Sequence, residues 1–294
     1  MAAPGPDEPL TQSFEQERAR LVAMAYRLLG SLADAEDAVQ EAWLRLARQD
    51  ATAIDNLAGW LTTVVGRICI DVLRSRKKGA VTSYDDALPD LVVTEDDGGA
   101  PEDEVLLAES VGLALLVVLD SLRPAERLAF VLHDMFAVPF DEIGQILGRS
   151  TDAAKMLASR ARRKVQGTQR PSDDRRQQRE VVDAFLAAAR DGDFEGLLKV
   201  LDPDITWRAH TARGVVVRRG APEVAAKLQR AVHSRAVARR VLVNGEPGIM
   251  AWSPSGKPVA VMACTVVDGR MAEVVSIIDP DRLAAMELPS LPSD

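Results

Sequence analysis

The sequence predicts a multidomain chain with two all-α domains, the second ending in a helix-turn-helix, followed by an α+β domain whose N-terminal helices precede a curved mixed sheet. Three observations lead to this prediction. Helical periodicity runs through residues 11–79 and again through residues 105–168. A strongly acidic segment, residues 80–104, separates the two helical stretches. From Glu180 onward, two helical segments are followed by a series of β-type runs with Gly, Pro and Asn-Gly punctuation.

The distribution of charge is more informative than its sum. The chain has 294 residues, of which 47% are apolar, so two or three domains can each bury a core. Its net charge of −8 does not by itself suggest a nucleic-acid binder. However, residues 149–170 contain seven basic residues and one acidic residue, whereas residues 81–104 contain nine acidic residues and no basic one. This asymmetry predicts a basic binding surface at 149–170 and an acidic linker at 80–104 that is too polar to bury a core.

The two cysteines and the chain ends exclude several classes of protein. Cys69 and Cys264 lie far apart and have no partners at metal-ligand spacing, so we expect two packed thiols, no metal site and no cofactor. No apolar run approaches the length of a membrane span, and the N-terminus lacks a basic start and an apolar core. We therefore expect a cytoplasmic protein without a membrane partner.

Residues 139–165 have the pattern of a helix-turn-helix. An amphipathic helix over 140–147 is stopped by Gly148, and Ser150 or Thr151 can cap the next helix. The second helix has a buried stripe made of Ala154, Leu157, Ala158, Ala161 and Val165. The residues expected to face a DNA groove are Arg149, Ser150, Thr151, Lys155, Met156, Ser159, Arg160, Arg162 and Arg163. The alternative is an ordinary helical hairpin with a solvated charged face.

Two upstream helices each have two distinct faces. In the helix over 31–47, Asp34, Asp37 and Glu41 lie opposite an apolar stripe, and the simplest interpretation is a solvated acidic face. In the helix over 60–78, the core side comprises Leu61, Val65, Ile68, Cys69, Val72 and Leu73. The opposite side comprises Trp60, Arg67, Asp71, Arg74 and Lys78. An aromatic ring among three cations suits a nucleic-acid strand, although a partly buried Trp beside a soluble basic helix end remains the alternative.

Together these motifs resemble the bacterial RNA polymerase sigma factors of the extracytoplasmic-function class. The resemblance is carried by DAEDAVQEAWLRL, by the following W-L…R-x-x-x-D-x-L-R helix and by the helix-turn-helix. It implies a region 2 domain over 11–79, a flexible linker over 80–104 and a region 4 domain over 105–168. The partners implied are promoter DNA and core RNA polymerase, bound at the clamp helices of its largest subunit.

The resemblance also implies roles for individual residues. The polymerase-binding residues would be Asp34, Glu36, Asp37, Gln40 and Glu41. The −10 element would be melted and read by Trp60, Arg67, Asp71, Arg74, Ser75, Arg76 and Lys78, and the −35 element by the second helix of region 4. Many family members have Lys-Ser-Arg where this chain has Lys155, Met156 and Leu157, so the promoter sequence cannot be carried over. Gly66 also departs from the usual residue in the region 2 helix, at about 1 kcal/mol of helix propensity relative to Ala.

Residues 177–290 resemble a SnoaL-like domain, a cone-shaped fold, through the opening FLAAARDGDFEGLLKVLDPDITWRA. A subgroup of these sigma factors carries such a domain as a built-in regulator, so that no separate anti-sigma factor is required. Its motifs Trp-Leu-Pro-Glu-Pro and Asn-Pro-Asp-Lys-Phe/Leu are present here in weakened forms, at 87–90 and 279–283. The residues implied in a regulatory contact are Leu88, Pro89, Asp279, Pro280, Asp281, Arg282 and Leu283.

We therefore predict a transcription initiation factor that is not itself an enzyme. Catalysis in the third domain would need a carboxylate or His base inside an apolar cone, and the candidates for such a base are Asp204, His210, His233 and Asp279. Binding of a small ligand by this domain stays an open alternative. So does a stand-alone helix-turn-helix regulator with a small-molecule effector domain, although such a protein has no use for the region 2 segment. An enzyme with a helical N-terminal extension is the third alternative.

Overall fold

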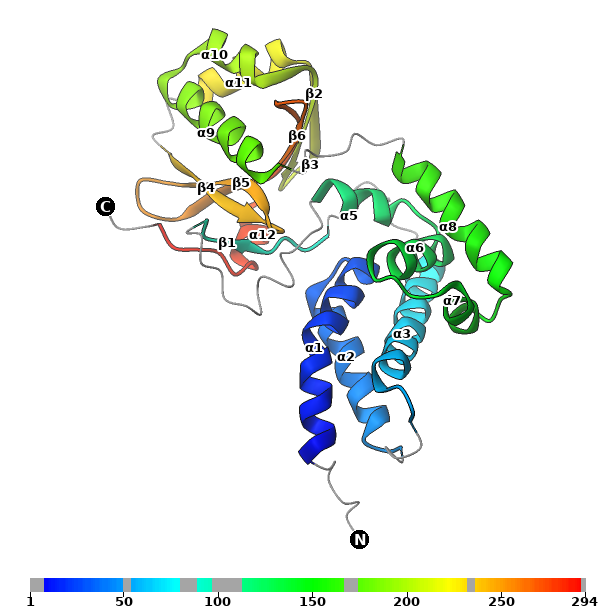
Figure 1. Ribbon diagram of the computed structural model, residues 1–294. Helices are drawn as coiled ribbons and strands as arrows, with labels where there is room; N and C mark the ends of the chain where they lie inside the picture. The colour runs from blue at the N-terminus through cyan, green and yellow to red at the C-terminus, as the bar shows by residue number, and fades with distance from the viewer. Residues whose placement is uncertain are drawn as a thin grey trace. The chain divides into compact units, whose positions relative to one another are not determined.

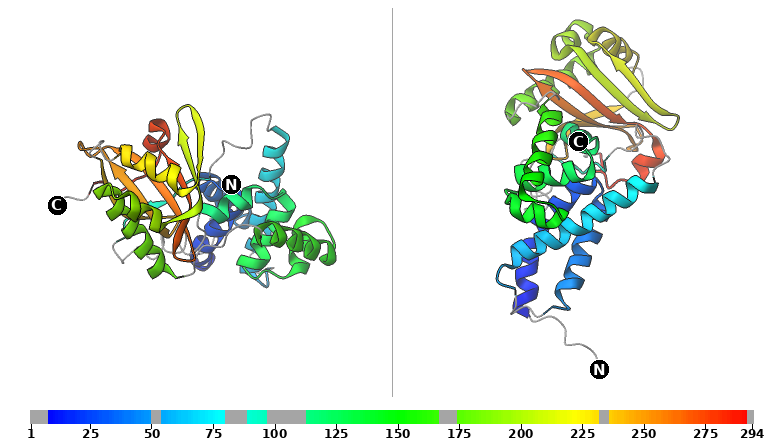
Figure 2. Two further views of the ribbon diagram at one scale, coloured as in Figure 1. Left: turned by 90° about the horizontal axis from the view of Figure 1, so that it is seen from above. Right: turned by 90° about the vertical axis from the view of Figure 1, so that its right-hand side faces the viewer.

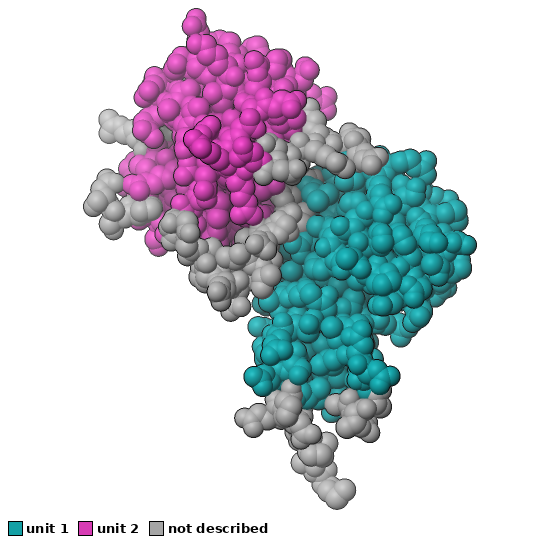
Figure 3. Space-filling view, in the orientation of Figure 1, with its two compact units in different colours: residues 1–83, 88–90, 115–168 teal, residues 84–87, 91–114, 169–294 magenta. Residues whose placement is uncertain are grey.

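The computed structural model describes residues 8–49, 54–79, 89–96, 113–166, 174–231 and 236–291 (Figure 1). The chain forms two compact units, which Figure 3 distinguishes by colour. Unit 1 comprises Met1–Ser83, Leu88–Asp90 and Leu115–Thr168, and unit 2 comprises Tyr84–Ala87, Leu91–Ala114 and Gln169–Asp294. None of the helices in the described ranges combines the length and the apolar character that a membrane crossing needs.

The first part of unit 1 is a group of three helices, α1 (Glu8–Leu29), α2 (Leu32–Leu46) and α3 (Leu57–Gly79). Ser31 begins α2 because its hydroxyl accepts a hydrogen bond from the backbone N–H of Asp34 at 3.4 Å. Leucine side chains from all three helices meet in a fully buried core, which includes Leu21, Leu28, Leu46 and Leu61. The predicted helical character of this stretch is confirmed.

The second part of unit 1 ends in the predicted helix-turn-helix. Its elements are α5 (Leu113–Asp120), α6 (Pro124–Phe130), the π-helix η2 (Val131–Met135), α7 (Phe140–Leu147) and α8 (Thr151–Gln166). Gly148 ends α7 with a φ of +64°, the left-handed conformation that glycine adopts without steric cost. The predicted bounds of α7 and the glycine stop are both confirmed.

Within unit 1, helix α3 packs against the helix-turn-helix as well as against α1 and α2. Gly66 is the point of close approach, because a Cβ atom there would lie 3.4 Å from the side chain of Ile146 and 3.7 Å from that of Leu132. One turn further along the same stripe, Ile70 is 2% exposed. Neither position belongs to the single core face that the helical pattern predicts for α3, because α3 buries a second side against the helix-turn-helix.

Unit 2 is a mixed sheet with α9, α10 and α11 on one face (Figures 1 and 2). Its helices are α9 (Arg175–Asp191), α10 (Phe194–Val200), α11 (Ala221–Ala231) and α12 (Pro280–Ala284). Its main strands are β2 (Leu201–Thr211), β3 (Gly214–Arg219), β4 (Val237–Val243), β5 (Glu246–Trp252), β6 (Pro258–Val267) and β7 (Arg270–Ile277). Helices α9, α10 and α11 cover the sheet around a core that contains Val182, Phe185, Leu197 and Ile205.

The strand order is β1-β4-β5-β6-β7-β2-β3, and β2 pairs parallel with β7 while every other pair is antiparallel. The predicted mixed sheet and its β-type runs are therefore confirmed. Helix α11, between β3 and β4, was not among the expected elements. The Asn-Gly turn at Asn244 and Gly245 and the Asp-Gly turn at Asp268 and Gly269 connect strands with positive φ angles, as such dipeptides favour.

The seventh strand comes from the acidic linker. Strand β1 (Val93–Thr94) pairs antiparallel with Leu242 and Val243 of β4, so it forms one edge of the sheet. Leu91 and Val93 are buried, at 8% and 6% exposed. The prediction of a linker too polar to bury a core is wrong for residues 91–96. The apolar run Leu91-Val92-Val93 gains hydrogen bonds and burial at an open sheet edge, which local composition does not reveal.

Two glycines of unit 1 should respond in opposite ways to substitution by alanine, Gly66 where α3 packs on α7 and Gly144 where α7 meets the following turn. Gly66→Ala should raise the free energy of unfolding by up to about 1 kcal/mol, because its methyl group fits at an ordinary contact distance and alanine favours helix. Gly144→Ala should lower it by about 1–3 kcal/mol, because its Cβ atom would lie 2.8 Å from the backbone oxygen of Arg149. Urea unfolding of both variants tests this contrast, and a loss of stability in Gly66→Ala would contradict the described packing.

Candidate nucleic-acid interface

Helix α8 presents a polar and cationic face to solvent. Ala154, Leu157, Ala158 and Ala161 are buried as predicted, while Met156 is 56% exposed. Ser150 caps the helix by accepting a hydrogen bond from the backbone N–H of Ala153 at 3.3 Å. Thr151 begins the helix and is partly buried. The remaining exposed residues of the predicted −35 face are Arg149, Lys155, Ser159, Arg160 and Arg163.

Three cations of α8 have partners inside unit 1: Lys155 pairs with Asp152 of the same helix at 3.4 Å, and two others pair with neighbouring elements. Arg162 forms an ion pair with Asp134 of η2 at 2.6 Å, and Lys164 forms one with Glu126 of α6 at 2.9 Å. The Glu126 side chain is 5% exposed, so its carboxylate needs this partner. These pairs hold α8 against the rest of the helix-turn-helix domain. Arg162, which the sequence analysis assigned to DNA, therefore also has a structural role.

The acidic face of α2 is exposed at three of the five predicted positions, namely Glu36, Asp37 and Gln40. Glu41 is partly buried and forms an ion pair with Arg45 at 2.9 Å, one helical turn away. Opposite this face, Ala35, Val39 and Ala42 are buried, so the predicted two-sided helix is confirmed. The role of the acidic face in polymerase binding stays a prediction.

On α3, the predicted −10 residues Arg67, Asp71, Arg74, Ser75 and Arg76 are exposed, and Trp60 is partly buried. Asp71 and Arg74 form an ion pair at 3.6 Å. The side chain of Lys78 lies outside the described residues. The structure thus brings most of the predicted −10 residues together along one helix.

Arg76 and Asp34 were predicted to contact different partners, but in unit 1 they contact each other. Arg76 forms an ion pair with Asp34, and its Nη1 donates a hydrogen bond to the backbone oxygen of Leu29 at 2.8 Å. Both side chains are about 40% exposed, at 44% and 40%, so the pair contributes little free energy of its own. Arg76 thereby joins the end of α3 to the turn between α1 and α2.

Arg67 also has a partner within unit 1. Its Nη2 donates to the backbone oxygen of Gln145 in α7 at 3.5 Å. A residue predicted to read the −10 element is thus in contact with the helix-turn-helix that is predicted to read the −35 element.

The interior of unit 2 is apolar where the helices meet the sheet. Trp207 packs on Phe185 of α9 with ring centroids 6.3 Å apart, and its indole N–H donates to Ser276 Oγ at 2.9 Å. Because strand residues alternate between faces, His210 lies on the other side of the sheet from Trp207. Asp204 is exposed, Asp279 caps α12, and His233 lies outside the described residues. Of the described candidate bases, Asp279 therefore has a structural role as a helix cap.

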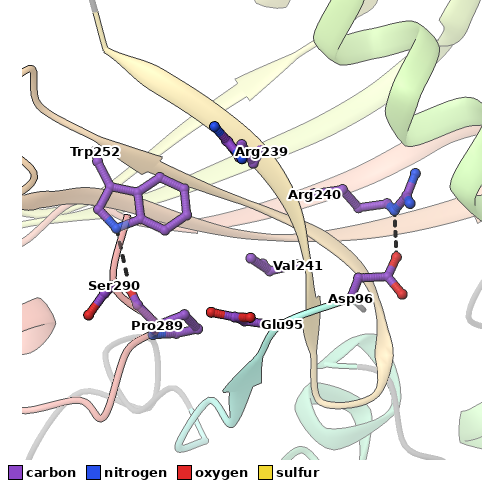
Figure 4. A pocket seen from close by; sticks show the side chains of 8 residues that line it. All are labelled: Glu95, Asp96, Arg239, Arg240, Val241, Trp252, Pro289 and Ser290. Atoms are coloured by element: carbon purple, nitrogen blue, oxygen red, sulfur yellow. Dashed lines mark hydrogen bonds and ion pairs between the residues drawn. The ribbon is translucent and has the colours of Figure 1, made fainter. Parts of the chain in front are cut away.

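A half-open cavity of about 180 Å³ lies at the β1–β4 edge of unit 2 (Figure 4). It is formed by the linker, the sheet and the C-terminal tail, through the residues Glu95, Asp96, Arg239, Arg240, Val241, Trp252, Pro289 and Ser290. Trp252 is 1% exposed, and its indole N–H donates to the backbone oxygen of Pro289 at 3.3 Å. These parts are far apart in the chain, so no local sequence pattern indicates the cavity.

Comparison with known families assigns three regions of the chain. Sigma-70 region 2 matches residues 14–79, sigma-70 region 4 matches residues 112–165, and a SnoaL-like domain matches residues 182–277. The extracytoplasmic-function RNA polymerase sigma factor SigJ of Mycobacterium tuberculosis is 39% identical over 298 residues, which cover 94% of this chain and 93% of that protein. The chain belongs to the extracytoplasmic-function sigma factors.

Two further relatives agree with this family. The probable extracytoplasmic-function sigma factor SigI of M. tuberculosis is 34% identical, with 94% of this chain and 95% of that protein covered. The crystal structure of M. tuberculosis SigJ matches with a TM-score of 0.76 and 37% identity, and the match covers 95% of this chain and all of that one. This sigma factor therefore has the predicted fold, with helical sigma domains followed by a SnoaL-like domain.

The two segments predicted to form a regulatory contact lie in different units. Pro89 is buried, and the neighbouring Asp90 binds the turn between α1 and α2, where its carboxylate accepts from Leu32 N at 3.0 Å. At 279–283, Asp279 accepts a hydrogen bond from Asp281 N at 3.0 Å, Pro280 begins α12, and Leu283 is buried. Leu88 lies outside the described residues. A contact between these segments stays a prediction.

One buried carboxyl in the SnoaL-like domain makes stability depend on pH. Burial raises the pKa of Glu246 to about 7, and the nearby charge of Arg175 only partly opposes this shift. An unfolded Glu titrates near pH 4.3, so the charged form is disfavoured in the folded state. The contribution of Glu246 to the free energy of unfolding is therefore fully present below about pH 4.3 and is lost as the pH rises to about 7.

Glu246→Gln should remove this dependence, since the amide stays neutral. Relative to the unsubstituted protein, we expect the variant to gain up to about 3 kcal/mol of unfolding free energy at pH 8 and much less at pH 5. Urea unfolding at the two pH values measures the difference, with the exposed Glu287→Gln as control. An equal effect at both pH values would contradict the buried carboxyl.

Proposed function

We propose that this protein binds core RNA polymerase and directs it to promoters, and that its SnoaL-like domain regulates this activity. Membership of the family makes promoter-directed transcription initiation the function of the chain. The observation that carries the proposal is the exposure of an acidic face on α2 and a cationic face on α8 in one chain. A stand-alone helix-turn-helix regulator would have no use for the first face.

The polymerase contact is assigned to the exposed part of α2. Glu36, Asp37 and Gln40 point to solvent from a helix whose other face is buried, so they are free to meet a basic helical surface. The clamp helices of the largest polymerase subunit are the partner that the family implies. Asp34 joins this surface when its ion pair with Arg76 opens.

Promoter contacts are assigned to α8 and α3. Lys155 and Arg163 are exposed cations suited to phosphates, and the exposed Met156 suits an apolar contact with a thymine methyl group in the major groove. On α3, Arg67, Arg74 and Arg76 would hold the strand at the −10 element. Trp60, which is only partly buried, would stack on or wedge between bases.

Regions 2 and 4 would have to separate before both elements are read. The −10 and −35 elements are about 25 base pairs apart, or about 85 Å at roughly 3.4 Å per base pair. In unit 1, Gly66 of region 2 is packed on Ile146 of region 4, and Arg67 is bonded to α7. The packed arrangement is therefore proposed to be the state of the free protein.

We propose a regulatory role for the SnoaL-like domain, without catalysis and without a separate anti-sigma factor. The apolar packing of Trp207 on Phe185 where the sheet meets the helices supports this role, as does the capping role of Asp279. Run-off transcription with purified core polymerase tests the proposal directly. Promoter-dependent transcripts are expected when this protein is added, and their absence would contradict the proposal.

Charge reversal on α2 tests the polymerase contact. Asp37→Lys with Glu41→Lys should abolish co-purification with core polymerase while the helical circular dichroism signal is retained, because surface charges usually change stability by no more than about 0.5 kcal/mol. Glu180→Lys with Glu287→Lys is a matched control, since Glu180 is also ion-paired to an arginine one turn away. Undiminished polymerase binding by the α2 variant would exclude this face.

Substitutions at neighbouring positions of α8 separate phosphate contacts from base contacts. Lys155→Ala should weaken binding to all DNA sequences and reduce the slope of log affinity against log salt by roughly one unit. Met156→Ala should leave this slope unchanged and relax the preference at one base pair. Fluorescence anisotropy with promoter variants at several salt concentrations measures both effects. A sequence-independent loss of affinity in both variants would contradict the role of Met156.

A further inference from the structure

The sheet of the SnoaL-like domain has two edges, and within the described residues the chain itself covers only one of them. At that edge, β1 pairs with β4. At the other edge, β3 pairs with β2 along its inner side and is the last strand of the sheet. A strand edge with unpaired N–H and C=O groups is a template for pairing with another chain. The outer side of β3 is therefore a candidate interaction surface.

The backbone of β3 presents every second residue to its outer side. The pairing with β2 is fixed where the strand ends, because Gly220 donates its N–H to the oxygen of Ile205 at 2.8 Å. Hydrogen-bonded pairs alternate along an antiparallel ladder, so the residues an even number of positions before Gly220 bond to β2 and the others point outward. The outward residues are Val215, Val217 and Arg219. Within the described part of the sheet, no strand pairs with them on this side.

The middle of this edge lacks the features that usually prevent pairing with another strand. Such features are prolines, bulges and charged side chains. Residues 215–217 are three valines, and β3 pairs with β2 over six residues without a shift of register. Val216 and Val217 lie on opposite faces of the strand, and they are 40% and 46% exposed. Both faces of an added strand would therefore find an apolar neighbour.

Arginines flank the three valines. Residues 206–219 contain four arginines and no acidic residue. Arg208 forms an ion pair with Glu273 of β7, so the excess positive charge comes from the other three. These are Arg213, Arg218 and Arg219. Arg218 has only a long contact with Glu223, at 3.9 Å. The edge thus combines an apolar middle with cationic ends.

Charge and hydrogen bonding together decide between the possible occupants. A second copy of the chain would bring two cationic strand pairs side by side, and like charges across a strand pair are destabilising. The phosphates of a nucleic acid would pair with the arginines, but they would leave the exposed valines and most of the outward backbone groups without partners. An extended acidic peptide provides partners for the backbone, the valines and the arginines at once.

We propose that the outer edge of β3 is a strand-addition site for an extended acidic segment of a partner protein. The segment pairs antiparallel to β3, with two acidic residues opposite Arg219 and Arg218, followed by β-branched residues opposite Val217 and Val216. The site lies outside the surfaces assigned to polymerase and promoter DNA. The inference therefore goes beyond the proposed sigma function and does not depend on it.

Binding of a synthetic peptide to the full-length protein tests the proposal. The probe is fluorescein-labelled Thr-Glu-Glu-Val-Thr-Val-Thr, and fluorescence anisotropy measures its affinity. We expect saturable binding, and about tenfold weaker binding when both Glu residues are replaced by Lys. Absence of saturable binding, or equal affinity for the two peptides, would overturn the proposal.

Methylation of the peptide backbone tests whether the contact is a strand pair. In the proposed register, the N–H groups of the first Glu and of both Val face β3, whereas those of the second Glu and of the last two Thr face away. N-methylation of the first set should weaken binding by about tenfold or more, and N-methylation of the second set by no more than about threefold. An equal loss of affinity from both sets would contradict strand addition.

Variants of β3 test the same contact from the side of the protein. Val217→Pro removes an outward N–H and should weaken binding by about tenfold, whereas Val217→Ala keeps the N–H and should weaken it by no more than about threefold. Arg219→Glu should reverse the preference, so that the Lys peptide binds more tightly than the Glu peptide. Arg270→Glu, at an exposed position of β7, is the matched control and should change neither affinity.

Three results would overturn the proposal in favour of another occupant or of none. Undiminished binding in Val217→Pro with loss in Arg219→Glu would show a purely electrostatic surface, of the kind that a DNA backbone uses. A concentration-dependent dimer in analytical ultracentrifugation that Val217→Pro abolishes would show that a second copy occupies the edge. An unchanged peptide preference in Arg219→Glu would place the peptide elsewhere. Circular dichroism checks the fold of each variant, and if Val217→Pro does not fold, the methylated peptides decide.

Discussion

The buried guanidinium group of Arg127 is the constraint around which regions 2 and 4 are packed. Its side chain is 2% exposed, and burial lowers its pKa even though Asp120 opposes this shift. A buried cation is tolerated only when it is paired, and Arg127 is paired with Asp120 at 2.9 Å and with the backbone oxygen of Arg27 at 3.2 Å. Asp120 lies in α5 and Arg27 in α1, so the group contacts both regions. In the proposed separated state, the ion pair would stay within region 4, and the bond to Arg27 would be exchanged for water.

Several residues predicted to contact polymerase or DNA are likewise paired within the chain. Arg76 and Asp34 satisfy each other, Arg67 bonds to α7, and Arg162 pairs with Asp134. These partners are partly exposed, so their contacts contribute little free energy and can be exchanged for polymerase or DNA. The pairing of Asp96 is different, because its side chain is nearly fully buried between Arg179 and Arg240.

Sequence patterns predicted what depends on local periodicity. The bounds of α7, the glycine stop at Gly148, the buried stripe of α8 and the cap at Ser150 each follow from neighbouring residues, and the structure confirms them. Long-range packing escaped the prediction. In sequence, Gly66 is only a weak helix former, and its role as a packing position depends on Ile146. Likewise, Leu91-Val92-Val93 lies in a polar linker, and its burial depends on the open edge of β4. The side-chain roles toward polymerase and DNA depend on partners outside the chain and stay predictions.

The central claim is that regions 2 and 4 are packed together in the free protein and separate on a promoter. Spin labels at Arg48→Cys, after α2, and Asp141→Cys, in α7, would occupy two exposed positions while the native cysteines stay buried. Pulsed electron–electron double resonance then gives the distance between them in the free protein and in the complex with core polymerase and promoter DNA. We predict one narrow distribution in the free protein and a shift of tens of ångströms to longer distance in the complex, since the two promoter elements lie about 85 Å apart. The same short distance in both states would contradict the account.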